Sequence, residues 1–252
     1  MRVLVTFAVE AEFAPWRKLR QFERSEIEGC SAFSTTIDGM RLDVLLTGIG
    51  GKKAWVEATK IIWDGDTEVC ISSGLAGGLR DEQRPEDVFV ARNVHAPNWK
   101  TVVRADGDLV EVAVAAGAKM VGDLYSADRV VVLSSDKREL GKIADAVDME
   151  SGDILYEAWT FGARVVAVRA ISDSVEEDLP LDFNRVTTDL GDVSMPRVLG
   201  EVVQSPGSIP ALIRFGKQSR KAAERLAKVL EKMVTTLAAS NQVGNPAKAY
   251  KV

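Results

Sequence analysis

Short apolar runs alternate with longer segments of helical periodicity along most of the chain. The runs are rich in Val, Ile and Leu, and they predict buried strands at residues 2–9, 41–47, 69–73, 88–94, 129–133, 146–149 and 163–170. The segments between them predict helices at about residues 10–20, 52–63, 108–120, 137–141, 151–161 and 210–239. Strands that alternate with helices are typical of an α/β architecture with a largely parallel or mixed sheet, and this is the predicted fold class.

Nothing along the 252 residues marks a boundary between two domains. The chain has no internal repeat, low-complexity block or linker, and a single α/β domain often reaches this length. Residues 176–196 form an acidic stretch that contains Pro180 and Gly191, which predicts a loop. We therefore expect one domain over residues 1–240, followed by a flexible tail at residues 241–252.

The composition is that of an ordinary globular protein, with 46% hydrophobic and 27% charged residues. Asp and Glu total 37 against 32 for Lys and Arg, so the net charge is −5, and nucleic acid is not an expected partner. The N-terminal apolar run is too short for a signal peptide. No apolar run approaches the roughly 20 residues that a membrane-spanning helix needs.

The cysteines and the histidine restrict the possible chemistry. Cys30 and Cys70 form no C-x-x-C pattern, so neither a zinc site nor a disulfide framework is predicted, and a reduced, cytoplasmic location is expected. His95 is the single histidine of the chain, and we interpret it as structural. We therefore expect a site without a metal or an organic cofactor.

The strongest chemical signal is a pair of carboxylates, Glu150 and Asp173, which lie 23 residues apart. This spacing fits the end of one strand, a helix, and the end of the next strand. If the two strands are consecutive and parallel, both side chains face one crevice at the edge of the sheet. One carboxylate then binds sugar hydroxyls and the other handles a proton, which predicts a site that breaks a bond to a sugar. The alternative is that both are solvated or helix-capping groups.

Two glycine-rich segments follow predicted strands, at residues 48–51 and 74–78, and the acidic pair Glu10 and Glu12 follows a third. A turn without Cβ atoms lets the backbone approach a ligand, and the N-terminus of a following helix binds anions. The first segment is neither a dinucleotide fingerprint nor a Walker loop, because Lys53 and Ala54 occupy positions that those motifs assign to other residues. Each segment alone is equally explained as a tight connection between a strand and a helix.

The order of these motifs resembles the nucleoside phosphorylase/nucleosidase superfamily, which includes purine and uridine phosphorylases and methylthioadenosine/S-adenosylhomocysteine nucleosidases. The resemblance covers about residues 2–235 and is carried by Ala8-Val9-Glu10-Ala11-Glu12, Thr47-Gly48-Ile49-Gly50, Gly74-Leu75-Ala76-Gly77-Gly78-Leu79, Asp148-Met149-Glu150-Ser151 and Arg169-Ala170-Ile171-Ser172-Asp173. It implies a three-layer α-β-α sandwich with a central mixed sheet. Local matches at 74–78, 147–151 and 205–206 further resemble the hopanoid-associated phosphorylase subfamily.

The resemblance implies a catalytic role for two acids. Asp173 would protonate N7 of a departing purine, and Glu12 matches the residue that activates water in the nucleosidase branch. Ser172 and Arg169 would orient Asp173 and its loop.

The resemblance also implies how the substrate binds. Glu150 would bind the ribose 2′- and 3′-hydroxyls, with Met149 packed against the sugar. The base would lie beside Ala76 and Gly77, with Val131 lining its pocket. The region for phosphate or water would be formed by Gly48, Gly50, Gly74 and Leu75.

Several positions depart from the family pattern. Leu75 replaces a hydroxyl residue found in many relatives, and Ser72 stands where several phosphorylases have a phosphate-binding arginine. Val130 stands where nucleosidases have an aromatic residue. The resemblance therefore leaves open whether water or inorganic phosphate is the acceptor. It also leaves a second hypothesis, a nucleoside-binding protein of the same fold without catalysis.

The segment 214–232 is rich in basic residues, namely Arg214, Lys217, Arg220, Lys221, Arg225, Lys228 and Lys232. It is explained either as the solvated face of a packed helix or as a surface for peripheral contact with anionic membrane lipids. The family resemblance implies a homo-oligomer. Trp16, Trp55 and Trp63 are candidates for its interface, and core positions explain them equally well.

Overall fold

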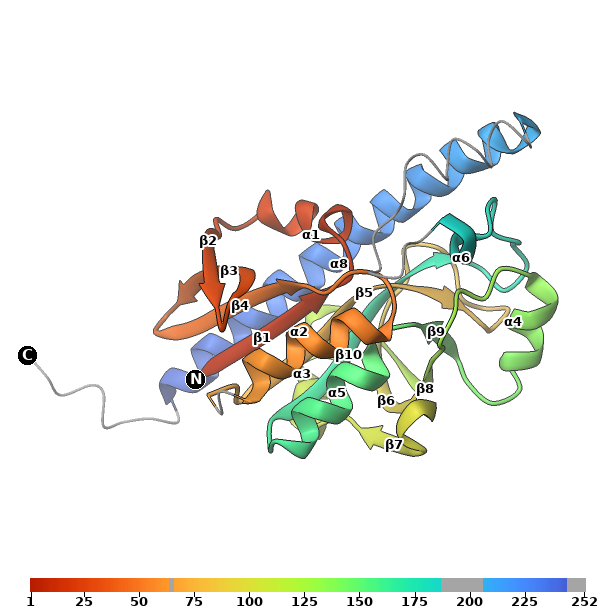
Figure 1. The fold of residues 1–252 in the computed structure, drawn as a ribbon. Helices are drawn as coiled ribbons and strands as arrows, with labels where there is room; N and C mark the ends of the chain where they lie inside the picture. The colour runs from red at the N-terminus through yellow and green to blue at the C-terminus, as the bar shows by residue number, and fades with distance from the viewer. Residues whose placement is uncertain (64–65, 187–205, 244–252) are drawn as a thin grey trace, which may run out of the picture.

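The computed structural model describes residues 1–63, 66–186 and 206–243, apart from the side chains of residues 51–55, 57, 186, 206, 242 and 243. These residues form one ten-stranded mixed sheet with helices on both faces (Figure 1). The strands are β1 (Arg2–Phe7), β2 (Glu23–Ile27), β3 (Cys30–Ile37), β4 (Met40–Leu46), β5 (Val69–Gly78), β6 (Val88–Ala96), β7 (Thr101–Arg104), β8 (Lys119–Ser126), β9 (Ala146–Asp148) and β10 (Arg164–Asp173).

The sheet is built around β1 and β5. β1 lies between β4 and β5 and runs parallel to both. β5 also pairs with β10 in parallel and with β9 in antiparallel orientation. β10 pairs with β6, β6 with β8, and β8 with β9, so five strands close into a ring at this side of the sheet. The hairpin of β2 and β3 extends the other side through β4.

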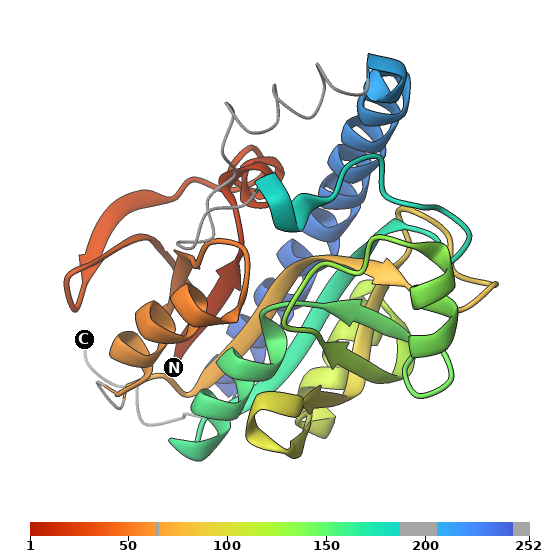
Figure 2. The same ribbon diagram turned by 45° about the vertical axis from the view of Figure 1, so that its right-hand side comes forward.

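The helices divide between the two faces of the sheet (Figures 1 and 2). The helices are α1 (Glu10–Arg17), α2 (Gly51–Trp63), α3 (Gly107–Ala116), α4 (Ser134–Leu140), α5 (Ser151–Thr160), α6 (Phe183–Val186) and α8 (Ile209–Val243), with short 3₁₀ turns at Pro97–Trp99 and Pro206–Ser208. α1, α3 and α8 pack together on one face, and α2 and α5 pack together on the other.

Alternate residues of the buried strands supply both cores, as the strand period of two requires. Val3 and Val5 of β1 point into the core beneath α1, α3 and α8, whereas Leu4 points into the core beneath α2 and α5. Aromatic rings fill the first core, where the Phe7 and Phe13 centroids lie 5.5 Å apart. The predicted α/β fold and its three-layer sandwich are therefore confirmed.

The structure differs from the predicted elements in several places, which include the unpredicted strand β7 and the short helix α6 inside the loop expected at residues 176–196. A strand was expected at residues 129–133, but these residues form no strand. The strand in this region is β8, which starts earlier because α3 ends at Gly117, whose φ is +114°. The β2–β3 hairpin was not predicted, since its residues are largely polar and partly exposed. The segment 74–78, expected as a turn that opens a helix, belongs to β5.

Helix α8 is the longest helix among the described residues, with 35 residues. Its second half is buried on one side from Ala222 to Ala238, and its first turns extend beyond the sheet (Figures 1 and 2). It continues to Val243, and the rest of the tail expected at residues 241–252 lies outside the described residues. No helix in the described part of the chain combines the length and apolarity needed to cross a membrane.

Candidate active site

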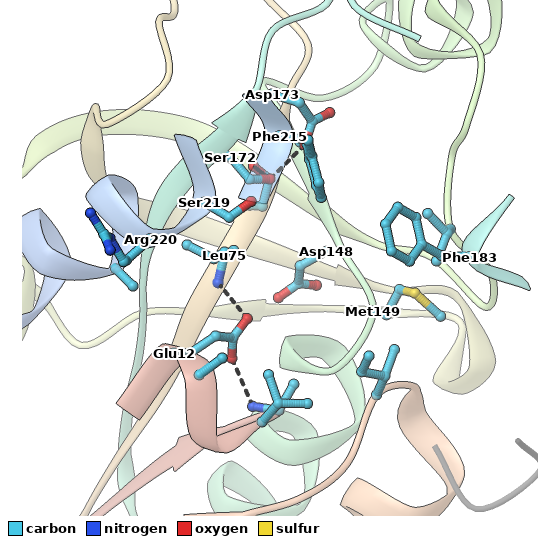
Figure 3. Close-up of a pocket in the computed structure, with 18 of the residues that line it drawn as sticks. Glu12, Leu75, Asp148, Met149, Ser172, Asp173, Phe183, Phe215, Ser219 and Arg220 are labelled. Carbon is cyan, nitrogen blue, oxygen red and sulfur yellow. Dashed lines mark hydrogen bonds between the residues drawn. The ribbon is translucent and has the colours of Figure 1, made fainter. Parts of the chain in front are cut away.

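A cavity of about 750 Å³ lies where the ends of β1, β5, β9 and β10 meet the first half of α8 (Figure 3). Its wall is mostly apolar, but it contains four buried carboxylates, those of Glu12, Asp148, Glu150 and Asp173. The structure therefore brings both residues of the sequence-predicted pair, Glu150 and Asp173, to one pocket. A buried group of acids in an otherwise apolar cavity is typical of a ligand or catalytic site.

Glu150 lies directly before the first residue of α5 and is held from two sides. Its Oε1 accepts a hydrogen bond of 3.0 Å from the backbone N–H of Gly50, and its Oε2 lies 3.5 Å from Nη1 of Arg169. Burial raises the pKa of Glu150 to about 7, although Arg169 opposes this rise. Near neutral pH the side chain is therefore divided between its two protonation states.

Arg169 of β10 is fully buried and lies behind the cavity rather than in its wall. Its Nη2 forms an ion pair of 2.8 Å with Asp148 and hydrogen bonds of 2.9 and 3.0 Å with the hydroxyls of Ser72 and Ser151. Arg169 was expected to orient Asp173, but the structure places it with Asp148 and Glu150. Ser72, one of the positions that depart from the family resemblance, accepts a hydrogen bond from this guanidinium.

Glu12 lies in the first turn of α1 and faces the cavity with both oxygens engaged (Figure 3). Oε2 accepts a hydrogen bond of 3.0 Å from the backbone N–H of Ala8, and Oε1 accepts one of 3.2 Å from that of Leu75. Burial raises the pKa of Glu12, and the charge of Arg169 is the largest opposing influence. A carboxylate fixed by the backbone and raised in pKa is suited to take a proton from water.

Asp173 ends β10 and has a partner on each oxygen. Ser172 donates to Oδ1 at 2.5 Å, and Nζ of Lys137 lies 2.5 Å from Oδ2. Burial raises the pKa of Asp173, and Lys137 opposes this rise more than any other group. Ser172 thus contacts Asp173, and its orienting role stays a prediction, whereas Lys137 was not among the predicted residues.

Glu150 and Asp173 both reach the cavity because of how the neighbouring strands pair with β5 at Gly77. This residue of β5 pairs with Asp173 on one side and with Val147 on the other. β9 runs antiparallel to β5, so the chain after Val147 leads Glu150 back along β5, away from the level of Asp173. The expectation that the two acids follow consecutive parallel strands is therefore wrong. The antiparallel course separates the two carboxylates along one pocket instead.

The other predicted residues fall into two groups. Ala76, Gly77, Val131, Met149 and Leu75 line the cavity directly. Gly48, Gly50 and Gly74 do not line the cavity and lie behind its wall.

Gly50 donates to Glu150, and Gly48 donates its N–H to Ala8 at 2.8 Å. Gly74 has φ of +136°, and a Cβ there would come within 2.7 Å of Arg169 and 2.8 Å of Glu12, so only glycine leaves room for both charged groups. His95 lies apart from the cavity and bonds Asp123 at 2.8 Å, which fits the structural role expected for it.

One further set of lining residues was not predicted, and its members are large and apolar. They come from the loop after β10, from α6 and from the first half of α8: Leu179, Phe183, Leu212 and Phe215. The ring centroids of Phe183 and Phe215 lie 5.6 Å apart. These residues are separated in sequence and carry no local motif, so their meeting depends on the tertiary fold.

The α/β sandwich holds one cavity with four buried carboxylates, and sequence comparison shows which family combines this fold with such a chain. The family model described as Phosphorylase superfamily matches residues 2–235, and the chain belongs to this family. A 5′-methylthioadenosine/S-adenosylhomocysteine nucleosidase of Bacillus licheniformis is 26% identical over 216 residues, which is 73% of this chain and 91% of the relative. A DeoD-type purine nucleoside phosphorylase of Streptococcus suis is 26% identical over 198 residues, covering 70% and 84%.

Solved structures show the same fold. The 5′-methylthioadenosine/S-adenosylhomocysteine nucleosidase of Neisseria meningitidis, in complex with methylthio-immucillin-A, aligns with a TM-score of 0.71 at 24% identity, over 93% of this chain and 99% of that one. A futalosine hydrolase mutant of Helicobacter pylori aligns with a TM-score of 0.71 at 18% identity, over 94% and 99%. The predicted superfamily membership is confirmed.

Proposed function

We propose that the protein cleaves the N-glycosidic bond of a purine nucleoside or nucleoside-like compound and releases the base. The observation that supports this most is the presence of Glu150 and Asp173, separated along one mostly apolar cavity, with Glu12 on the same wall. Cleavage of such a bond passes through an oxocarbenium-like sugar, and carboxylates assist it by protonating the leaving group and by binding the sugar hydroxyls.

Each acid has a distinct role in the proposed reaction. Asp173 donates its proton to N7 of the purine while the C1′–N9 bond breaks and its electron pair moves to the base. Glu150, when ionised, accepts hydrogen bonds from the ribose 2′- and 3′-hydroxyls. The negative charge of its carboxylate strengthens these hydrogen bonds. Glu12 takes a proton from the water that forms the new bond to C1′.

We propose water as the acceptor, on the basis of the buried charges around this wall. The basic residues that line the cavity, Lys18, Arg129 and Arg220, are exposed. Glu12, Asp148 and Glu150 supply three carboxylates, and Arg169 already forms an ion pair with Asp148. A phosphate dianion would be repelled by these acids, whereas a water molecule is a suitable ligand for them. Inorganic phosphate remains the co-substrate to be tested.

The apolar part of the cavity supports a nucleoside that carries a large apolar group. Phe183, Phe215 and Leu212 offer a surface with no charge to satisfy, and the cavity is large enough for more than a nucleoside alone. With the subfamily resemblance, this supports a hopanoid-linked nucleoside and a role in hopanoid biosynthesis. Phe215→Ala should then raise KM for a 5′-alkylthioadenosine and leave KM for adenosine nearly unchanged. An equal rise in KM for both substrates would contradict a site for an apolar group.

The direct test is a base-release assay on a panel of purine nucleosides, with and without inorganic phosphate. We expect release of free base without phosphate. Release that depends on phosphate would replace hydrolysis by phosphorolysis and leave the roles of Asp173 and Glu150 unchanged. Binding of a nucleoside without any turnover would support the nucleoside-binding hypothesis instead.

We also propose that the protein is located in the cytoplasm and contacts membrane surfaces through the first turns of α8. Ile209 and Ile213 are 42% and 54% exposed there, next to the basic residues Arg214 and Lys217. Farther along the helix, Lys221 and Arg225 pair with Glu86, which offsets part of their charge. Flotation with anionic vesicles should show binding at low salt that high salt weakens, and absence of binding at low salt would refute it.

We propose that the protein forms a homo-oligomer. The grounds are its family membership and the exposed aromatic residues of α2 and α5. Trp63 and Trp159 are 59% and 52% exposed, and the ring of Trp63 lies 5.8 Å from that of Phe161. Trp16, in contrast, is a core residue whose Nε1 donates to Glu231. Sedimentation equilibrium should give a multiple of 27.3 kDa, and a monomer at micromolar concentration would contradict the proposal.

A further inference from the structure

Lys137 of α4 is a fully buried lysine, which is rare unless its charge is paired. Its Nζ contacts Oδ2 of Asp173, the carbonyl of Ser174 at 3.1 Å and the carbonyl of Glu177 at 2.6 Å. The ammonium group has three N–H donors, and these three acceptors satisfy all of them. The side chain is therefore fixed in position, with its charge directed at one oxygen of Asp173.

Lys137 does not line the cavity, so it cannot touch the substrate and must act through Asp173. We propose that Lys137 is a positioning residue for the leaving-group proton: it holds Asp173 in place and stabilises the carboxylate that forms when this proton moves to the purine. The inference rests on the proposed function, because it concerns the acid of that same reaction.

The physical need for such a cation follows from the burial of Asp173. A carboxyl group in an apolar environment retains its proton, because the carboxylate that would form is poorly solvated. Such a group is a weak acid for protonating a purine nitrogen. A fixed ammonium group beside Oδ2 removes much of this penalty, while Ser172 holds Oδ1. The proton then leaves Asp173 for N7, and the remaining carboxylate faces a positive charge already in place.

A second set of contacts holds the same segment without Lys137. Gln218 of α8 donates to the carbonyl of Ser172 at 2.7 Å and to the carboxylate of Glu177 at 3.0 Å. The backbone N–H of Ser174 also donates to Glu177 at 3.0 Å. The chain around Asp173 is therefore tied to α8 independently of α4. Removal of the lysine charge should change the acidity of Asp173 more than its location.

The test compares two substrates in one variant, Lys137→Met. The first substrate is the purine nucleoside that the wild-type protein turns over best, and the second is the same nucleoside methylated at N7. The methylated base is already cationic and leaves without a proton from the enzyme. We expect kcat for the first substrate to fall about 10- to 100-fold, within the range of general-acid effects, and kcat for the second to change less than about threefold.

An equal loss for both substrates would overturn the inference, because a merely structural role lowers every turnover alike. Partial unfolding of Lys137→Met also lowers both rates equally, so the ratio of the two rates remains informative. Lys137→Gln keeps N–H donors without the charge, and it should show the same selective loss. Lys142→Met is the matched control, since Lys142 follows the same helix, is 67% exposed and pairs with Glu139.

Failure of the underlying function gives a different result from failure of this inference. If the wild-type protein releases no base from any nucleoside, the proposed function fails. If the wild-type protein releases base and Lys137→Met keeps the wild-type ratio between the two substrates, only the role of Lys137 fails.

Discussion

Replacement of Glu150 by Gln should make the protein more stable at alkaline pH while it removes a substrate contact. In the unfolded chain the glutamate pKa is 4.5, and burial raises it to about 7 in the fold. The folded protein therefore binds the extra proton between these values, and the free energy of unfolding falls as the pH rises through this range. Below pH 4.5 both states are protonated, and the group contributes no pH dependence.

The magnitude follows from the two pKa values. A difference of about 2.5 units at about 1.36 kcal/mol per unit gives a penalty of about 3 kcal/mol above pH 7. At pH 5 only about 1 kcal/mol of this penalty has developed. Glu150→Gln cannot ionise and lacks the penalty at every pH. The free energy of unfolding of the variant minus that of the wild type should therefore increase by about 2–3 kcal/mol when the pH is raised from 5 to 8.

Urea unfolding of both proteins at pH 5 and pH 8 measures this gain. Effects of the substitution that do not depend on pH, such as altered contacts of the amide with Arg169 or Gly50, cancel in the comparison of the two pH values. Glu139→Gln is the control, because its side chain is 73% exposed and is screened by solvent. A gain below about 1 kcal/mol for Glu150→Gln, or an equal gain for the control, would refute the reasoning.

Two further substitutions test the neighbouring groups. Arg169→Met leaves the carboxylates of Asp148 and Glu150 buried without their cation. The free energy of unfolding measured in urea should therefore fall by about 3–5 kcal/mol. A loss under about 1 kcal/mol would show that stability does not depend on these ion pairs. Glu12→Gln keeps an oxygen for the backbone donors but cannot take a proton, so base release should fall at least about 100-fold, while calorimetry should show nucleoside binding within about threefold of wild type. Unchanged turnover would remove Glu12 from the mechanism.

Local signals in the sequence were sufficient for most elements and for the acids of the site. Apolar runs gave β1, β4, β6 and β10 to within a few residues, because buried strands have a strong composition. The spacing of Glu150 and Asp173 correctly indicated one cavity, although the parallel course assumed for the two strands was wrong.

The features that were missed depend on distant parts of the chain. Lys137 meets Asp173 from an element 36 residues away, and nothing near it in the sequence indicates this contact. Gly74 was read as part of a turn, but it lies in a strand, where the absence of a Cβ makes room for Arg169 and Glu12. The direction of β9 could not be predicted either, because a strand of three residues has the same pattern in both orientations.

The central claim is that Asp173 gives a proton to a departing purine. Its most direct test is the rate of free-base release from a purine nucleoside by the wild-type protein and by Asp173→Asn, followed by chromatography of the base. We expect release by the wild type and a rate at least about 100-fold lower for the variant, with nucleoside binding retained. Equal rates for the two proteins would contradict it.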